Sequence, residues 1–250
     1  MSANRLDLLL LERNLVSTRT KAQELIREGK VLVNGKVARK TGEKFESEVQ
    51  ITLLAAEHPF VSRGGLKLQA ALETFALVVE GKRVLDLGQS TGGFTHCLLE
   101  AGAAEVVGVE VGHGQLAPSL RDDPRVKCFE NQDIRKLPPE SLRPGFSLCV
   151  VDLSFISLRL VMPHLPPFLL PGADMVLLVK PQFEVGPGNV GSGGIVRDAK
   201  MRAQALSAVE KICRELGFTV AGSIPSPVEG SDGNREFLLH LQWHSSAATF

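Results

Sequence analysis

The stretch that decides the fold is VLDLGQSTGGFTHCLLEAG, residues 84–102. It begins as a short apolar strand, passes through a glycine-rich turn and continues as a helix, which is the start of a βα unit. Glycines in such a turn let the backbone approach a ligand closely, and the N-terminus of the next helix carries partial positive charge. The glycine spacing fits neither the dinucleotide fingerprint G-x-G-x-x-G nor the nucleoside-triphosphate fingerprint G-x-x-x-x-G-K-S/T.

Strand-like apolar runs recur along the chain, at residues 83–88, 105–111, 126–129, 148–153, 175–179, 218–223 and 237–243. Helical patterns lie between them, and the clearest spans residues 199–216, with Asp198 as its N-cap and Gly217 directly after it. Seven strands that alternate with helices predict an α/β domain with a doubly wound, Rossmann-like sheet.

The first 55 residues follow a different pattern. Leucines at helical spacing predict a helix near residues 6–10, and a second helix ends at Gly29. The pair Asn34-Gly35 between two apolar runs predicts a β-hairpin, and a third strand is expected at residues 49–54. We therefore expect a small α+β module in front of the larger domain.

Charge is unevenly distributed along the chain. The whole sequence has 28 Lys+Arg against 28 Asp+Glu, but residues 13–44 hold nine cations and three anions, a local net charge of +6. A module of this size has a marginal core, so we expect it to present a surface, and a cationic surface suits a phosphate backbone. A merely solvated charged face is the alternative.

Polar residues follow the predicted strands at the edge where a doubly wound sheet binds its ligand. The second strand ends in Glu110, which is placed to accept hydrogen bonds from the two hydroxyls of a nucleoside ribose. After the third strand, Asp133 could accept one from an exocyclic amine, and Asp152 follows the fourth. This series predicts an S-adenosylmethionine site. Its expected members are Asp86, Gly88, Ser90, Gly92, Gly93, Phe94, Glu110, Asp133 and Asp152.

Two lysines and two acids occupy the same predicted edge. Lys67 lies on a helix before the first strand, Lys180 ends an apolar strand, and Asp152 and Glu236 flank two others. Any one of them alone is more often solvated or ion-paired. Four together suit the methylation of a ribose 2′-hydroxyl, a poor nucleophile that needs a base and neighbouring charges for in-line attack on a sulfonium methyl group. A lysine can act as that base only when burial or nearby cations leave part of it neutral.

Several classes of protein are excluded by composition. The chain is 44% hydrophobic and 22% charged, as expected of a globular protein. The uncharged run 160–173 has only 14 residues and carries four prolines, so no spanning helix is expected. Asp7 and Glu12 interrupt the apolar N-terminal run, which excludes a secretory signal and favours a cytoplasmic location. The four cysteines are widely spaced, so we expect buried free thiols and no metal site.

The run RLDLLLLERNLVSTRTKAQELIREGKVLVNGKVARK, residues 5–40, resembles the alpha-L RNA-binding domain of ribosomal small-subunit protein four, tRNA synthetases and pseudouridine synthases. The resemblance covers about residues 4–56. It implies that the helix pair and the hairpin grip structured RNA, in agreement with the local charge. The residues then expected to contact RNA are Arg5, Arg13, Arg19, Lys21, Arg27, Lys30, Lys36, Arg39, Lys40 and Arg63.

The motifs VSRGGLKL, DLGQSTGGFTHCLL, EVGHGQL, DLSFISL, LVKPQFEVG, GGIVRD and GNREFL closely resemble the TlyA family of ribosomal RNA 2′-O-methyltransferases, historically labelled haemolysin A. The resemblance spans nearly the whole chain and has both domains in the family's order. It implies an RNA-binding domain at residues 4–56, a linker at 57–63 and a methyltransferase domain at 64–245.

These enzymes are similar to the FtsJ class of ribose methyltransferases, which carry a Lys-Asp-Lys-Glu tetrad. The tetrad falls on Lys67, Asp152, Lys180 and Glu236, the residues that the strand ends also select. The resemblance implies that Lys180 deprotonates the ribose hydroxyl, that the other three residues orient it and the ribose, and that S-adenosylmethionine is the cofactor.

The sequence departs from the family pattern at a few positions. Gln89 replaces a small residue and could crowd the methionine part of the cofactor, His96 replaces an aspartate, and the ribose-binding acid is Glu110. The linker EHPFVSRGG also lacks the family's arginine and tryptophan. We expect an active enzyme with weak cofactor affinity in the absence of RNA.

The resemblance implies methylation of a cytidine ribose in ribosomal RNA. Only 14 residues follow Glu236, as in shorter family members, which favours the large subunit alone over both subunits. We expect a monomer that partners ribosomal RNA or ribosomal subunits and no membrane. The alternatives are a membrane-active haemolysin, an RNA-binding assembly factor with an inactive methyltransferase fold, and a small-molecule methyltransferase.

Overall fold

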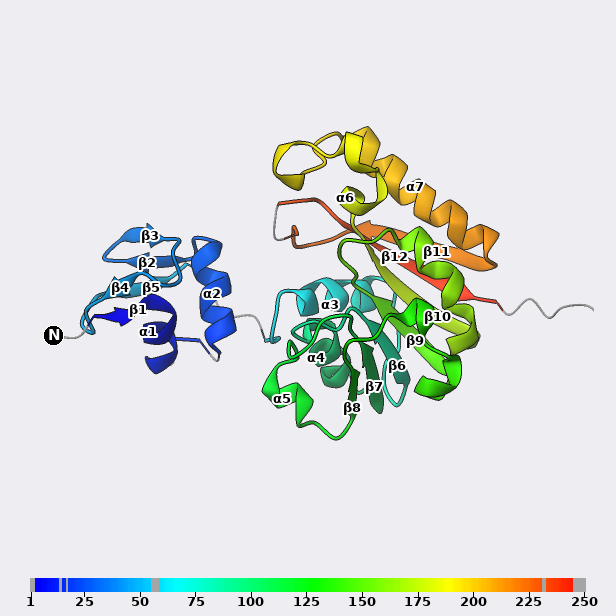
Figure 1. Ribbon diagram of the computed structural model, residues 1–250, viewed down its shortest axis with the longest axis horizontal. Helices are drawn as coiled ribbons and strands as arrows, with labels where there is room; N and C mark the ends of the chain where they lie inside the picture. Colours follow the sequence, from blue (N-terminus) through cyan, green and yellow to red (C-terminus); the bar gives the residue numbers. More distant parts are fainter. Residues whose placement is uncertain (1–2, 14, 17, 55–58, 231–232, 245–250) are drawn as a thin grey trace, which may run out of the picture. The chain divides into compact units, whose positions relative to one another are not determined.

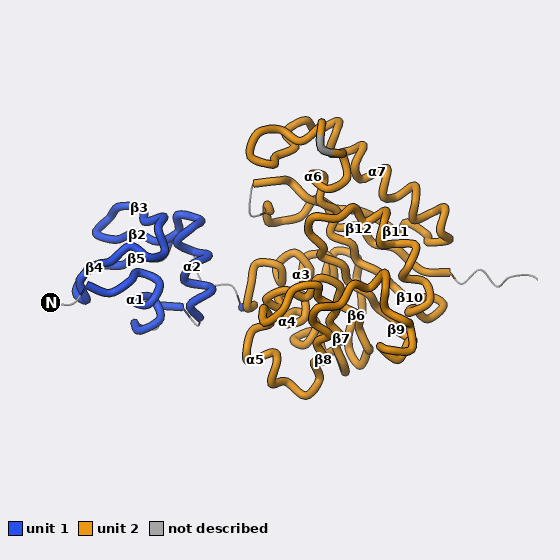
Figure 2. Tube along the Cα trace, in the orientation of Figure 1, with its two compact units in different colours: residues 1–59 blue, residues 60–250 orange. Residues whose placement is uncertain are grey.

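The computed structural model describes residues 3–13, 15–16, 18–54, 59–230 and 233–244 (Figure 1). The chain divides into two compact units, unit 1 at Met1–Pro59 and unit 2 at Phe60–Phe250 (Figure 2). This division falls inside the linker predicted at residues 57–63. Residues 57 and 58 of that linker lie outside the described residues, and so do residues 55 and 56 of the first predicted domain and residue 245 of the second.

Unit 1 is a small α+β module. Its elements are β1 (Asn4–Arg5), α1 (Leu6–Glu12), α2 (Arg19–Arg27), β2 (Val31–Val33), β3 (Lys36–Ala38), β4 (Lys44–Phe45) and β5 (Ile51–Leu53). The turn Asn34-Gly35 joins β2 to β3 with positive φ at both residues, which suits a tight hairpin, as the sequence predicts. The expected third strand, β5, pairs with the other edge of β2. β1 and β4 form a separate two-stranded sheet that the sequence did not indicate.

Unit 2 contains a seven-stranded sheet in the order β11-β12-β10-β9-β6-β7-β8. The strands are β6 (Arg83–Leu87), β7 (Glu105–Val109), β8 (Val126–Phe129), β9 (Phe146–Val151), β10 (Leu169–Val179), β11 (Phe218–Pro225) and β12 (Phe237–Trp243). β12 runs antiparallel to both of its neighbours, and the other pairs are parallel. The strand order reverses between β6 and β9, at the switch point where doubly wound sheets bind ligands. The predicted fold class is confirmed.

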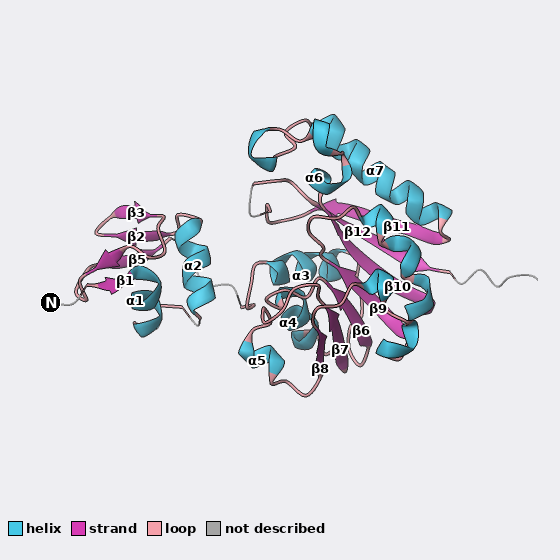
Figure 3. Cartoon of the chain, in the orientation of Figure 1, coloured by secondary structure: helices cyan, strands magenta, loops and turns pink. Residues whose placement is uncertain are grey.

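Helices cover both faces of this sheet (Figure 3). They are α3 (Gly64–Thr74), α4 (Gly93–Glu100), α5 (Pro118–Arg121), α6 (Pro181–Glu184) and α7 (Ala199–Glu215). Because successive strand residues point to opposite faces, Leu85 and Leu87 of β6 belong to one core cluster with Val209 of α7, whereas Val84 belongs to a second cluster with Leu68 of α3 and Leu98 of α4. The sheet is therefore buried on both sides, and its ligand must enter at an edge.

The segment between β9 and β10 departs from the predicted alternation of strands and helices. It holds three short 3₁₀ turns, Leu158–Leu160, Met162–His164 and Pro166–Phe168, in place of an α-helix. Pro163, Pro166 and Pro167 explain the difference, because proline lacks a backbone N–H and disfavours a helical residue before it. β10 also begins well before the predicted residue 175, with a register shift that precedes Asp174.

The four cysteines are free, and three of them are buried as predicted. Cys128 is only partly buried, because β8 is the last strand of the sheet and has a neighbour on one side only. In the described part of the chain, no three His, Cys, Asp or Glu side chains come together in a way that could hold a metal ion. Nor do the described residues include a helix with the length and apolar character to cross a membrane.

Candidate active site

Two shielded ion pairs contain the four residues predicted to be catalytic. Lys67 Nζ lies 2.6 Å from Glu236 Oε2, and the two side chains are 10% and 2% exposed. Lys180 Nζ lies 2.7 Å from Asp152 Oδ1, and these side chains are 12% and 23% exposed. Lys180 also donates a hydrogen bond of 2.9 Å to Ser154 Oγ. The second pair is the more accessible one, chiefly because Asp152 is more exposed than Glu236.

The sheet topology brings these side chains to one edge. Asp152 directly follows β9, and Lys180 directly follows its parallel neighbour β10. Glu236 precedes β12, which runs antiparallel to β10 and pairs Phe237 with Val179. Parallel strands end at the same edge, and an antiparallel strand starts there. The strand ends thus place Asp152, Lys180 and Glu236, and helix α3 carries the fourth member of the tetrad, Lys67.

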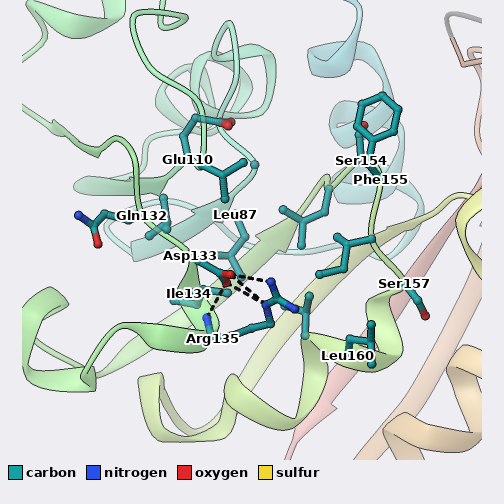
Figure 4. Close-up of a pocket in the computed structure, with 16 residues that line it drawn as sticks. Leu87, Glu110, Gln132, Asp133, Ile134, Arg135, Ser154, Phe155, Ser157 and Leu160 are labelled. Atoms are coloured by element: carbon teal, nitrogen blue, oxygen red, sulfur yellow. Dashed lines mark hydrogen bonds and ion pairs between the residues drawn. The ribbon is translucent and has the colours of Figure 1, made fainter.

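A cavity of about 600 Å³ opens at the switch point of the sheet, between the ends of β6 and β7 and the loops after β8 and β9 (Figure 4). Its wall is mostly apolar, and two carboxylates, Glu110 and Asp133, face it together with Gly88. A Cβ at Gly88, whose φ is 83°, would lie 2.2 Å from the carbonyl oxygen of Asp152, so no other residue fits this turn. The volume and lining are those of a cofactor site.

The two carboxylates in the wall are held by hydrogen bonds. Glu110, 8% exposed, accepts one from the backbone N–H of Ser90 (2.9 Å) and one from that of Gly112 (2.7 Å). Each of its oxygens retains a lone pair for a ribose hydroxyl. Asp133 accepts from the backbone and guanidinium of Arg135, at 2.6–3.2 Å, and these bonds lower the pKa of Asp133 and keep it ionised. Both acids therefore lie in the cavity wall, Asp133 together with its partner Arg135, and their predicted contacts with a cofactor stay a prediction.

Other residues predicted to contact the cofactor lie in the protein interior. Asp86 is completely buried and Phe94 is 3% exposed, and neither lines the cavity. A Cβ at Gly93 would lie 2.2 Å from Ser62 Oγ, so this glycine is required where α4 meets the start of α3. Packing within the chain thus explains Gly92 and Gly93, and their predicted contact with a cofactor stays a prediction.

The two unusual residues of the glycine turn and helix also point inward. Gln89 is 2% exposed, donates a hydrogen bond of 2.8 Å to Thr95 Oγ1 and fills the space over Gly108. Its side chain is not part of the cavity wall, so the expected crowding of the cofactor is not supported. His96 Nδ1 accepts a hydrogen bond of 3.1 Å from the backbone N–H of Val61, which fastens the first residues of unit 2 to α4.

The cations of unit 1 fall into two groups. Arg5 and Arg19 bind the carboxylate of Asp7, and Arg13 donates to backbone carbonyls of residues 47 and 49. Lys21 is 3% exposed, because it lies on the buried face of α2, and its predicted contact with RNA is corrected. Lys30 is partly exposed, as is Arg63, which lies at the start of unit 2. The exposed members of the predicted set are Arg27, Lys36, Arg39 and Lys40, together with Arg19, which is paired with Asp7.

Sequence reasoning missed two candidate site residues in the motif DLSFISL. Ser154 accepts a hydrogen bond from Lys180 and lines the cavity. Phe155 at the cavity rim is 90% exposed, and its φ of 64° is a left-handed conformation that is strained for a bulky residue. Its ring lies 5.4 Å from that of Phe183. The motif DLSFISL indicated that this loop is functional, but its sequence does not show that Ser154 and Phe155 face the cavity.

The sheet order and the cavity at its switch point define the class of S-adenosylmethionine-dependent methyltransferase folds. The family described as FtsJ-like methyltransferase matches residues 60–243, and the family described as S4 domain matches residues 4–51. The chain belongs to the TlyA family of FtsJ-like methyltransferases with an N-terminal S4 domain.

Individual relatives extend over nearly the whole chain. The 16S/23S rRNA (cytidine-2′-O)-methyltransferase TlyA of Mycobacterium tuberculosis is 46% identical over 98% of this chain and 91% of its own. The 23S rRNA (cytidine-2′-O)-methyltransferase TlyA of Campylobacter jejuni is 33% identical over 92% of this chain and 96% of its own. A solved structure from Streptococcus thermophilus, whose name contains the word hemolysin, is 40% identical over 98% of this chain and 90% of its own, with a TM-score of 0.78.

Proposed function

We propose that the protein transfers a methyl group from S-adenosylmethionine to the 2′-hydroxyl of a cytidine in ribosomal RNA. The observation that carries the proposal is the placement of two lysine–carboxylate pairs at the edge of the sheet where a nucleoside-sized cavity opens. Ser154 links them to it, because it lines the cavity and accepts a hydrogen bond from Lys180. The names of the relatives that match nearly the full chain support the ribosomal RNA substrate. Such a substrate would place the reaction in the cytoplasm.

The cavity residues fit the cofactor's nucleoside. Glu110 would accept hydrogen bonds from the ribose hydroxyls, Asp133 would accept one from the adenine amine, and the apolar wall would enclose the base. When bound, the cofactor supplies an electrophilic sulfonium methyl group. A site that excludes water strengthens the attraction between the fixed carboxylates and a bound positive charge.

The tetrad would prepare the ribose hydroxyl. Lys180 is held by Asp152 and by Ser154, which lines the cavity, so its Nζ would take the proton of the 2′-hydroxyl. Lys67 and Glu236 form the more deeply buried pair and would orient the ribose through a fixed hydrogen-bonding surface. Transfer then moves the methyl group to the 2′-oxygen while the hydroxyl proton passes to Lys180. Lys180 can accept this proton only as a neutral amine, so the ammonium of its pair with Asp152 has to give up one proton to solvent beforehand.

Phe155 would hold the target base. Its exposed ring beside the cavity offers a face on which an unstacked base can stack, as aromatic side chains do in single-stranded RNA recognition. The exposed cations of unit 1 would contact the phosphate backbone of the RNA.

Transfer of tritiated methyl label from S-adenosylmethionine to purified ribosomal subunits tests the proposal. We expect label in RNA, and after digestion in a 2′-O-methylated cytidine. Label in protein or in a small molecule, or none at all, would refute the proposed substrate.

The target subunit is a further part of the proposal. We favour the large subunit, and primer extension on both RNAs from cells with and without the gene checks it. A stop lost from the small-subunit RNA would refute the narrower assignment. A haemolysis assay on the wild-type protein addresses the membrane-active alternative, for which we expect no lysis.

A further inference from the structure

Glu184 is a buried carboxylate outside the tetrad and outside the cavity wall. It ends α6, in the same short segment as Lys180, and is 5% exposed. Ser157 Oγ donates to its Oε2 at 2.6 Å, and the backbone N–H of Leu158 donates to its Oε1 at 2.7 Å. Arg159 adds a contact of 3.3 Å to the carboxylate and a hydrogen bond of 3.0 Å to the backbone carbonyl of Glu184.

These partners belong to the loop that forms one wall of the cavity. Residues 153–157 and 160–161 all face it, so the donors to Glu184 lie within the wall segment (Figure 4). At the other end of the same loop, Asp152 and Ser154 contact Lys180. The loop after β9 and the segment after β10 are therefore joined twice, once through Lys180 and once through Glu184.

The carboxylate is retained at an energetic cost. Burial raises the pKa of Glu184 above its usual range, and the hydrogen bonds from Ser157 and Leu158 oppose that shift. An apolar side chain would fill the space without this cost, whereas a carboxylate with three partners fixes the positions of the groups that donate to it. The arrangement is thus better explained by geometry than by stability.

We propose that Glu184 is a positioning residue for methyl transfer: its carboxylate fixes the cofactor-facing loop 154–159 relative to the segment that carries Lys180. The inference rests on the proposed function and deepens it. Glu184 contacts neither substrate nor cofactor in this proposal, and it acts only by fixing the position of the loop that forms the cavity wall.

Glu184→Gln tests the inference in the full-length chain. Glutamine keeps the shape but has one accepting oxygen, so either the N–H of Leu158 or the guanidinium of Arg159 loses its acceptor, whereas the hydroxyl of Ser157 can accept from the new amide. We expect the KM for S-adenosylmethionine to rise about tenfold, as for a lost hydrogen bond to a charged group. We expect kcat to change less than about threefold, because saturating cofactor restores the bound arrangement of the wall. The KM for ribosomal subunits should not change.

Two further variants separate positioning from a general loss of stability. Ser157→Ala removes one donor, and its effect on the KM for cofactor should not add to that of Glu184→Gln, because both act on one contact. Glu210→Gln is the matched control, since Glu210 of α7 also pairs with an arginine, Arg214 at 3.2 Å, and its side chain neither lines the cavity nor bonds to the loop 154–159. An unchanged KM for cofactor in Glu184→Gln, a loss in kcat alone, or an equal loss in Glu210→Gln would overturn the inference.

Failure of the proposed function is distinguishable from failure of the inference. Absence of methyl transfer by the wild-type protein refutes the function. The rate of amide hydrogen exchange at residues 154–161, measured in the cofactor-free protein, then tests whether Glu184 holds the loop in place. Faster exchange there in Glu184→Gln than in the wild type and in Glu210→Gln supports the inference, and equal exchange overturns it.

Discussion

Among the residues that the structure describes, Asp7 of unit 1 and Asp86 of unit 2 are completely buried, and their pKa values shift in opposite directions. Asp7 of unit 1 accepts hydrogen bonds from Arg5, Arg19 and Gln23, which lower its pKa below its usual range. Asp86 of unit 2 accepts a hydrogen bond from the Thr95 hydroxyl and has no cationic partner in the described part of the chain. Burial raises its pKa to about 7, and the negative charges of neighbouring acids contribute to the rise.

The difference shows how each unit uses charge. Unit 1 neutralises a buried acid with arginines, which uses up part of the positive charge that the sequence assigns to RNA binding. Unit 2 gathers Asp86, Glu110 and Asp152 near one edge of the sheet and keeps its lysines in shielded pairs. We therefore expect substitutions in unit 1 to change RNA affinity and substitutions at the edge of unit 2 to change the chemical step.

The largest effect is expected from breaking the most buried pair. Lys67→Met leaves Glu236 buried without a partner, which should lower the free energy of unfolding by about 3 kcal/mol and methyl transfer by about a hundredfold or more. Chemical denaturation and the transfer assay measure the two effects. Lys211→Met, which breaks the exposed pair with Glu215, should cost less than about 1 kcal/mol and leave transfer unchanged.

A double variant sharpens this test. Lys67→Met with Glu236→Leu removes both charges and should recover most of the lost stability without recovering activity. We infer that the pair is kept for function although its burial costs energy. A double variant that is no more stable than Lys67→Met would contradict this inference.

The second-largest effect is expected on RNA binding, from removal of exposed cations in unit 1. The triple variant Arg27→Ala, Arg39→Ala, Lys40→Ala should weaken binding to ribosomal RNA and reduce the slope of log affinity against log salt by about 2 to 3, because each phosphate contact contributes about 0.7 to 0.9. We expect kcat to stay near the wild-type value. Arg13→Ala is the control, since Arg13 bonds to backbone carbonyls and should leave the salt slope unchanged. An unchanged slope in the triple variant would place the RNA-binding surface elsewhere.

The two buried aspartates should give opposite pH dependences. A carboxylate with a depressed pKa stabilises the fold above its unfolded pKa and loses that contribution as pH falls, so Asp7→Asn should destabilise the protein at pH 7 by roughly 2 kcal/mol and less at acid pH. Asp86 has a raised pKa, so its favourable protonated state is lost as pH rises through about 7. The loss begins near the unfolded pKa of about 4 and is complete near 7, so Asp86→Asn should stabilise the protein most at pH 8, less at pH 5 and least at pH 4.

Unfolding curves of both variants between pH 4 and pH 8 check this. Effects of the same sign, or effects independent of pH, would show that the environments of the two acids do not differ as described.

The smallest effect is expected at an uncharged buried residue of the glycine turn. Gln89→Ala should lower stability by about 1 to 2 kcal/mol, because Thr95 loses a hydrogen-bond donor and space opens over Gly108. The affinity for S-adenosylmethionine, measured by calorimetry, should change less than about threefold because the side chain faces away from the cavity. A tenfold gain in affinity would instead support crowding of the cofactor by Gln89.

The sequence predicted the sheet and the tetrad because both depend on local patterns. Alternating strands end at one edge, so Asp152 and Lys180 could be placed together without knowing any distance. It failed between β9 and β10, where closely spaced prolines outweigh the tendency of these folds to insert a helix.

Side-chain direction was the main feature that the sequence could not supply. Gln89 and Lys21 were expected to face a ligand, but packing against Gly108 and burial on the inner face of α2 turn them inward. Glu184 was missed because its partners lie 25 to 27 residues away in a loop without regular periodicity. Local charge counts and motifs do not contain such long-range information.

The most direct test of the central claim is the rate of methyl transfer by Lys180→Ala at saturating S-adenosylmethionine and ribosomal subunits, with RNA binding measured in parallel. Removal of the base should lower kcat by about a thousandfold, while RNA affinity and its salt dependence stay at wild-type values. A Lys180→Ala protein that transfers methyl groups at the wild-type rate would contradict the assignment of the chemical step to the edge of unit 2.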